Sequence, residues 1–147
     1  MATRRGGPVP VQGLLPRVKR VGRLLAVREE ASLQAVGIGR SQVQQLAEVA
    51  ATPGLSASEL ARRVGLTAQS VAASVAVLEQ RGWLRRVPHP VHRRVVELSV
   101  TPAGRRVLAR AGRALARVST AALSGLPAGK RKQLERLLGT WEAALGG

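Results

Sequence analysis

Apolar residues recur every three or four positions along the first third of the chain, which is the spacing of one face of a helix. The first run extends over residues 14–36, and its apolar face consists of Leu14, Val18, Val21 and Leu25. Gly37 and Gly39 interrupt it, and a second run over residues 41–51 continues through Val43, Leu46 and Ala50. The pattern predicts a long amphipathic helix, a break at the glycines and a short second helix.

Two helix starts follow at close spacing in the middle of the chain. Ser56 and Glu59 have the spacing of a capping box, so a helix is expected to start at Ser56 and to end at Gly65. Thr67 stands at the N-cap position of the next helix, which ends at Gly82. Its buried stripe is expected to consist of Val71, Val75 and Leu78. Two helices joined by so few residues cross steeply, which predicts a helix-turn-helix.

A short β-hairpin is expected directly after this second helix. Residues 83–87 read as a strand that Pro88 stops, and residues 94–100 alternate between apolar and polar side chains. The loop between these strands is basic, because residues 85–101 contain four arginines and two histidines. A hairpin in this place is the wing of a winged helix-turn-helix, and its tip can reach a groove beside the one that the helix enters.

The C-terminal third predicts two more helices. Pro102 stands at the favoured first position of a helix after Thr101, and a last helix is expected from about Lys130. The small winged lobe offers these helices and the N-terminal one no obvious partner, so they are expected to pack on each other and on a second copy of the chain. The alternative is a monomer whose own core buries the apolar faces of these helices. The predicted fold is mainly α with a small β-hairpin wing. A flexible basic tail (1–13) precedes the winged helix-turn-helix lobe (37–101), and a helical dimerisation region is formed by 14–36 and 102–147.

Charge changes this picture most. The chain carries 24 Lys and Arg residues against 8 acidic ones, for a formal net charge of +16. Such an excess favours a polyanionic partner, nucleic acid before an acidic membrane surface. A genome rich in G and C, which writes Arg at many surface positions, is the alternative source of part of the excess.

Composition also excludes several classes. The chain has no cysteine, and its two histidines cannot by themselves complete a tetrahedral metal site, so neither a metal nor another cofactor is expected. It has no Asp, no Gly-rich phosphate loop and no Ser-His-acid grouping, so no enzymatic activity is expected. No apolar stretch approaches the roughly 20 residues of a membrane span. The first 13 residues lack the apolar core of a secretion signal, which predicts a cytoplasmic protein.

Several short motifs carry a family resemblance. They are Leu-Ala-x-x-Val-Gly at 60–65, Leu-Glu-x-x-Gly at 78–82, arginines at 85, 86 and 94, and Leu-x-x-Thr-x-x-Gly at 98–104. Their order and spacing over about 50 residues resemble the DNA-binding lobe of the MarR family of transcriptional regulators. The resemblance implies a dimer formed through the terminal helices. It also implies a small, often anionic or aromatic effector in a cleft that Arg17, Arg20 or Arg23 could line, although a face of solvated arginines is the alternative.

The chain departs from the family pattern in two places. His92 stands where the family usually has an Asp in the wing, so the carboxylate that would hold the wing arginine, Arg94, is missing. A neutral imidazole could accept a hydrogen bond from that arginine, whereas a protonated one would repel it, which would make the wing geometry sensitive to pH. The favoured alternative is a solvated loop histidine with no switching role. In addition, no charged residue lies between Arg63 and Glu79, although family members commonly carry a basic residue on the recognition helix.

The predicted DNA contacts follow from these features. Polar side chains at the start of the recognition helix would read base edges, an alanine would contact a thymine methyl group, and arginines would contact phosphates or a minor groove. These residues are Thr67, Gln69, Ser70, Ala73, Arg62, Arg63, Arg85, Arg86, Arg93 and Arg94.

The sequence predicts a dimeric repressor of MarR type that binds a roughly palindromic double-stranded operator and is released by a small ligand. One alternative is a nucleoid-type or architectural protein that binds DNA without a defined operator. A third hypothesis is a winged domain that serves only protein contacts. The operator sequence, the regulated genes and the ligand do not follow from the sequence.

Overall fold

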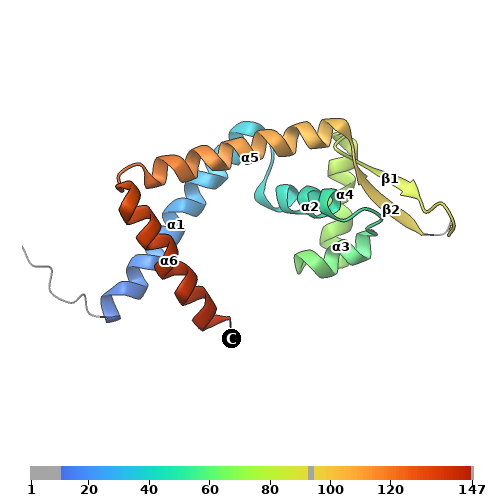
Figure 1. Cartoon of the computed structure of the whole chain (residues 1–147). Coiled ribbons are helices and arrows are strands. Elements are labelled where there is room, and N and C mark those ends of the chain that lie inside the picture. Colours follow the sequence, from blue (N-terminus) through green and yellow to red (C-terminus); the bar gives the residue numbers. More distant parts are fainter. Residues whose placement is uncertain (1–10, 93–94, 147) are drawn as a thin grey trace, which may run out of the picture.

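The computed structural model describes residues 11–92 and 95–146, which form six helices and one hairpin (Figure 1). In chain order these are α1 (Val11–Val36), α2 (Arg40–Ala51), α3 (Ala57–Val64), α4 (Ala68–Gln80), β1 (Leu84–Pro88), β2 (Val96–Val100), α5 (Pro102–Leu123) and α6 (Ala128–Leu145). The mainly helical fold with a β-hairpin wing is therefore confirmed. Residues 11–13 were predicted to belong to the tail, but they are already part of α1.

Figure 1 shows how the elements are arranged around α5. This helix lies along the top of the view, with the lobe of α2, α3 and α4 towards its right-hand end and α1 and α6 towards its left-hand end, while the hairpin extends beyond it to the right. The C-terminal half of α1 packs on α5, where Ser32 Oγ donates a hydrogen bond to the Ala114 carbonyl at 3.4 Å. Within the described residues, no helix is both long and apolar enough to cross a membrane.

The ends of α3 and α4 form as the capping signals predict. Ser56 Oγ accepts the Glu59 N–H at 3.3 Å, and Thr67 Oγ1 accepts the Ser70 N–H at 3.1 Å. Gly65 ends α3 with φ +68°, a left-handed conformation that favours glycine. One half of the capping box differs from the prediction, because the Glu59 carboxylate pairs with Arg62 and Arg63. The Glu59 carboxylate therefore binds the basic side chains in the last turn of α3 and does not accept the hydrogen bond from the Ser56 N–H that a full capping box would have.

One apolar core holds the lobe together. The predicted stripe of α4 is fully buried, and it packs with residues from every other element of the lobe and from the ends of α1 and α5. The core residues include Leu33, Ile38, Leu46, Leu60, Val71, Val75, Leu78, Leu84, Leu98, Val100 and Val107. In α2 the prediction was wrong at one position: Val49 is buried and Ala50 is exposed. A step of three residues from Leu46 keeps Val49 on the core side of the helix.

The hairpin is antiparallel, and its register pairs Leu84 with Val100 and Arg86 with Leu98. A third short segment joins the edge of β2, because the Leu98 N–H donates to the Leu55 carbonyl at 2.8 Å. β2 starts at Val96, two residues later than predicted, and Pro88 is the last residue of β1. Proline is tolerated at a strand end because the hydrogen bond that it cannot donate is not needed there.

The start of α5 is packed tightly against the start of β1. Thr101 Oγ1 donates to the Gly82 carbonyl at 2.6 Å, and the Thr101 N–H donates to the Trp83 carbonyl at 3.0 Å. A Cβ atom on Gly104 would lie 2.7 Å from Val100 Cγ1 and well inside contact distance of the Trp83 carbonyl oxygen. The absence of a side chain at Gly104 therefore lets the helix approach the backbone of the strand.

Replacing Gly104 with Ala should lower the free energy of unfolding by about 3 kcal/mol, because the added methyl group meets backbone that cannot move independently. Gly112, on an exposed part of the same helix, has no atom within 4 Å of an added Cβ and is the matched control. Gly112→Ala should raise stability by about 0.5–1 kcal/mol. Urea unfolding of both variants measures the difference, and equal stabilities for them would contradict the packing argument.

Candidate nucleic-acid interface

The first turn of α4 presents polar side chains to solvent. Thr67, Gln69 and Ser70 are all exposed, and Ala73 continues the exposed face one turn later. Thr67 Oγ1 donates to Ser70 Oγ at 2.8 Å while it accepts the Ser70 N–H, so these two side chains are held in place. The Gln69 amide has no hydrogen-bond partner among the described residues and keeps its donor and acceptor for another molecule.

Arg62 and Arg63 at the end of α3 are engaged in different ways. Arg63 Nη1 donates to Glu48 Oε1 at 2.9 Å and to Thr52 Oγ1 at 3.3 Å, which ties α3 to the C-terminal end of α2. The hydrogen bond that Arg63 donates to Glu48 raises the pKa of the Arg63 guanidinium, which stays charged. Among the described residues, Arg62 pairs only with Glu59 of its own helix, and its side chain remains 75% exposed.

Arg85 and Arg86 lie on opposite faces of the hairpin. Arg86 shares a face with Leu98 and donates from Nε to Glu79 Oε2 of α4 at 3.0 Å. Arg85 is paired with Ser99 on the other face, where it lines a cavity of about 330 Å³ together with Arg105 and Pro53. The structure therefore does not gather the four described arginines into one cluster. Arg93 and Arg94 lie outside the described residues, so their predicted contacts stay predictions.

The four glutamates of the lobe all face basic side chains. Glu48 and Glu59 pair with Arg63, Glu79 pairs with Arg86, and Glu97 lies 3.5 Å from His89 Nε2. Their carboxylates fix the positions of neighbouring elements, since the first of these pairs joins α2 to α3 and the third joins α4 to β1. The remaining positive charge of the lobe is left for a partner.

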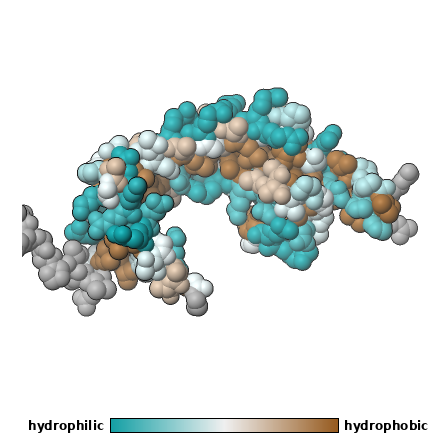
Figure 2. All heavy atoms as spheres, in the orientation of Figure 1, coloured by the Kyte–Doolittle hydropathy of each residue, from teal (hydrophilic) through white to brown (hydrophobic). Residues whose placement is uncertain are grey.

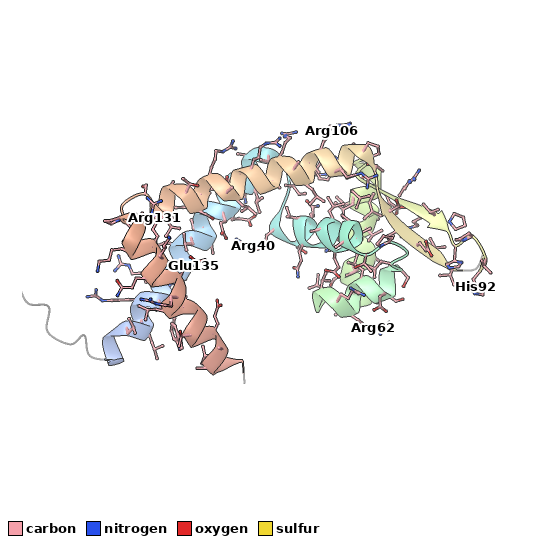
Figure 3. The ribbon with its side chains drawn as sticks, in the orientation of Figure 1. Arg40, Arg62, His92, Arg106, Arg131 and Glu135 are labelled. Carbon is pink, nitrogen blue, oxygen red and sulfur yellow. The ribbon has the colours of Figure 1, made fainter. Side chains whose placement is uncertain are left out.

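His89 shapes the tip of the wing, a role that the sequence analysis missed. Its Nδ1 accepts the N–H groups of Val91 at 3.1 Å and of His92 at 3.0 Å. An accepting Nδ1 carries no proton, so the hydrogen is on Nε2, which faces Glu97. His92, the residue singled out from the sequence, is exposed at the end of the hairpin (Figure 3). In an Asx turn, a side chain accepts hydrogen bonds from backbone N–H groups two or three residues later. The position of His89 two residues before Val91 and three before His92 is therefore the sequence feature that could have predicted this role.

Replacing His89 with Ala should loosen the wing tip, because both N–H groups lose their acceptor. We expect the backbone amides of Val91 and His92 to exchange with solvent about fivefold faster, the equivalent of about 1 kcal/mol. His89→Asn is the control, because an Asn carbonyl oxygen can accept from the same two donors. NMR exchange rates report the result. If the amides of the Ala variant exchange as slowly as those of the unmodified protein, His89 does not organise the tip.

The helices α3 and α4 pack on each other and are followed directly by the β1–β2 hairpin, which defines a winged helix-turn-helix protein. A sequence model of the MarR family matches residues 36–95. The chain is 28% identical over 119 residues to the HTH-type transcriptional repressor Rv2887 of Mycobacterium tuberculosis, across 81% of this chain and 86% of that protein. Over residues 36–95 the chain is therefore similar to the MarR family.

Two solved structures of Rv2887 extend the comparison. Its complex with DNA has a TM-score of 0.70 and 26% identity to this chain, covering 91% of this chain and 98% of that one. Its complex with p-aminosalicylic acid has a TM-score of 0.67 and 27% identity, with coverages of 95% and 100%.

Proposed function

We propose that this protein is a dimeric transcriptional repressor that acts in the cytoplasm, binds a roughly palindromic duplex and is released by a small ligand. The main observation behind this proposal is that the first turn of α4 is polar and exposed. This turn lies in the same lobe as the wing, and the chain as a whole is strongly basic. The similarity to Rv2887, a repressor solved with DNA and with p-aminosalicylic acid, supports both halves of the proposal.

The DNA contacts divide into two kinds. Gln69 is the side chain that can read a base edge, since its amide can make two hydrogen bonds to an adenine in the major groove. Thr67 and Ser70 lie beside it, and Ala73 has the small apolar surface that suits a thymine methyl group. Arg62, Arg63, Arg85 and Arg86, together with Arg93 and Arg94, would supply phosphate or minor-groove contacts, which set affinity more than sequence preference.

An architectural DNA-binding protein without a defined operator is the second candidate. The exposed face of α4 supports it, because that face carries Ala72, Ala73 and Ala76 and no charged side chain. Under this alternative the affinities for a selected operator and for random duplex would be equal, whereas a repressor distinguishes them by orders of magnitude.

Replacing Gln69 with Ala should lower affinity for an operator selected from random duplex by about tenfold, since a good bidentate base contact contributes about 1–3 kcal/mol of discrimination. Affinity for random duplex should not change. Arg62→Ala is the matched variant, which should weaken both duplexes alike and reduce the salt dependence of log Kd by about 0.9 per lost phosphate contact. Titrations at several salt concentrations test both. Equal losses on both duplexes for the Gln69 variant would favour the architectural protein.

The proposal of a dimer rests on apolar faces that this chain leaves uncovered. None of the described residues of α6 is buried, and the first half of α1 exposes a row of large apolar side chains (Figure 2). The exposed residues are Leu14, Leu15, Val18, Val21, Leu24 and Val27 in α1 and Leu134, Leu137, Leu138 and Leu145 in α6. A contiguous apolar surface on both terminal helices is typical of an interface.

An anionic effector would find positive charge in the groove between α1 and α5. A cavity of about 380 Å³ there is lined by Arg110, Arg113 and Arg117 of α5 and by Ser32, Ala35 and Val36 of α1. This groove is a stronger candidate than the face of Arg17, Arg20 and Arg23 suggested by the sequence. Of those three arginines, Arg23 lines a hollow with Lys19, Leu15 and Pro16 on α1 itself.

Replacing Leu137 with Glu should convert the dimer into a monomer at micromolar concentration, because the side chain, 57% exposed in one chain, would place a charge in an apolar interface. Lys132→Glu introduces the same residue on nearly the opposite side of α6 and should leave the dimer intact. Sedimentation analysis reads out both variants. A Leu137 variant that sediments as the unmodified dimer would remove α6 from the interface.

A further inference from the structure

The C-terminal end of the recognition helix is connected to the α1–α2 turn by one side chain. Arg81 follows the last residue of α4, and its Nη1 donates to the Gly37 carbonyl at 2.7 Å, across 44 positions of the sequence. Gly37 ends α1 with φ +83°, so its carbonyl direction is set by a turn that glycine permits. The bond therefore joins the end of α4 to the point where the chain leaves α1.

Both ends of the Arg81 side chain are fixed. Its backbone N–H donates to the Val77 carbonyl at 3.0 Å and caps α4. Its guanidinium carbon lies 4.9 Å from the centroid of the Trp83 ring, within the range of a cation–π contact. A planar guanidinium held over a ring presents its donors in a fixed direction, which suits a single bond to a backbone carbonyl.

The same end of α4 is also joined to α5. The residue after Arg81, Gly82, accepts a hydrogen bond from Thr101 Oγ1 at the N-cap of α5, and Trp83 accepts one from the Thr101 N–H. The end of α4 thus has two attachments, one to the end of α1 and one to the start of α5. Both of these helices lead into the region proposed to form the dimer.

The attached end of α4 determines where the opposite end, which would read DNA, is placed. α4 has 13 residues and is about 20 Å long at 1.5 Å per residue. Gln69 and its neighbours lie at the end opposite Arg81, so a small rotation at the attached end moves the reading end by ångströms. In a two-fold dimer the error is doubled, because both helices move relative to the shared helices.

We propose that Arg81 is a positioning residue for operator recognition. It fixes the direction of α4 relative to α1, and so sets the separation of the two reading helices and the spacing of half-sites that the dimer accepts. This inference rests on the proposed function as a dimer that binds a two-part operator. Arg81 itself is exposed, and a single surface hydrogen bond contributes little to global stability, so its removal affects alignment more than folding.

The experiment compares three duplexes: an operator selected from random DNA, and the same operator with one base pair inserted or removed between its half-sites. The unmodified dimer should bind the selected spacing best. Arg81→Ala should bind that duplex about tenfold more weakly if only about a tenth of the dimers then hold both α4 helices in the aligned direction, and it should discriminate less among the three spacings. Arg81→Lys keeps a donor for the Gly37 carbonyl and should restore part of the spacing preference. Gln80→Ala, an exposed neighbour in α4, should behave as the unmodified protein.

A flattened spacing profile separates positioning from a general loss of stability, which would weaken all three duplexes by the same factor. Thermal unfolding and sedimentation verify that each variant is a folded dimer. Should Arg81→Ala fail to fold, Arg81→Met decides, because it keeps an unbranched side chain beside Trp83 without a hydrogen-bond donor. A folded donor-free variant with the unmodified affinity and spacing profile overturns the inference. An unmodified protein that prefers no operator overturns the proposed function instead, whatever Arg81 does.

Discussion

The structure depends on the burial of one face of α4. Val71, Val75 and Leu78 are completely enclosed by the lobe, which fixes the rotation of the helix about its own axis. Burying one face of a helix also decides which side chains point to solvent on the opposite face. This packing therefore turns Gln69 and Ala73 outward. The capping bond that the Ser70 N–H donates to Thr67 Oγ1 then fixes where the helix begins, and with it the position of the first exposed turn. Recognition chemistry therefore follows from core packing and one cap, before any charge is considered.

Charge is divided between two tasks in the lobe. Glutamates are few, and each of the four in the lobe faces a basic side chain that belongs to a neighbouring turn, helix or strand. Arg63 and Arg86 thereby connect neighbouring elements through ion pairs, and they can contact phosphate only with the N–H donors that these pairs leave free. Arg62 and Arg85 are less constrained: one pairs only within its own helix, and the other has no acidic partner among the described residues. A sequence count of arginines overstates how many are free for DNA.

Local features of this fold could be predicted from the sequence, and contacts between distant elements could not. Ser56, Thr67 and Gly65 form the caps predicted for them, because a cap is decided by residues within one helical turn. Strand alternation also suffices to place the adjacent Arg85 and Arg86 on opposite faces, although their shared charge suggests a cluster. By contrast, the bond from Arg81 to Gly37 depends on how α4 crosses the end of α1. No spacing rule gives that crossing, because packing of the whole lobe sets it. The role of His89 was only partly predictable. Its hydrogen-bond partners are local, but histidine is a rare side-chain acceptor in turns.

Salt should act in opposite directions on the two associations that the proposed function requires, dimerisation and DNA binding. The proposed dimer would bring together two chains that each carry a net charge of +16. In each chain α5 contributes Arg106, Arg110, Arg113 and Arg117 at spacings that place them on one side of the helix. Figure 3 shows Arg106 pointing away from the lobe, and Figure 2 shows a hydrophilic surface along this helix. Screening weakens the repulsion between such chains, while the apolar contacts of α1 and α6 do not depend on screening. Raising the salt concentration would therefore favour the proposed dimer while it weakens DNA binding. A loss of DNA binding at high salt would then be caused by weaker phosphate contacts and not by dissociation of the proposed dimer.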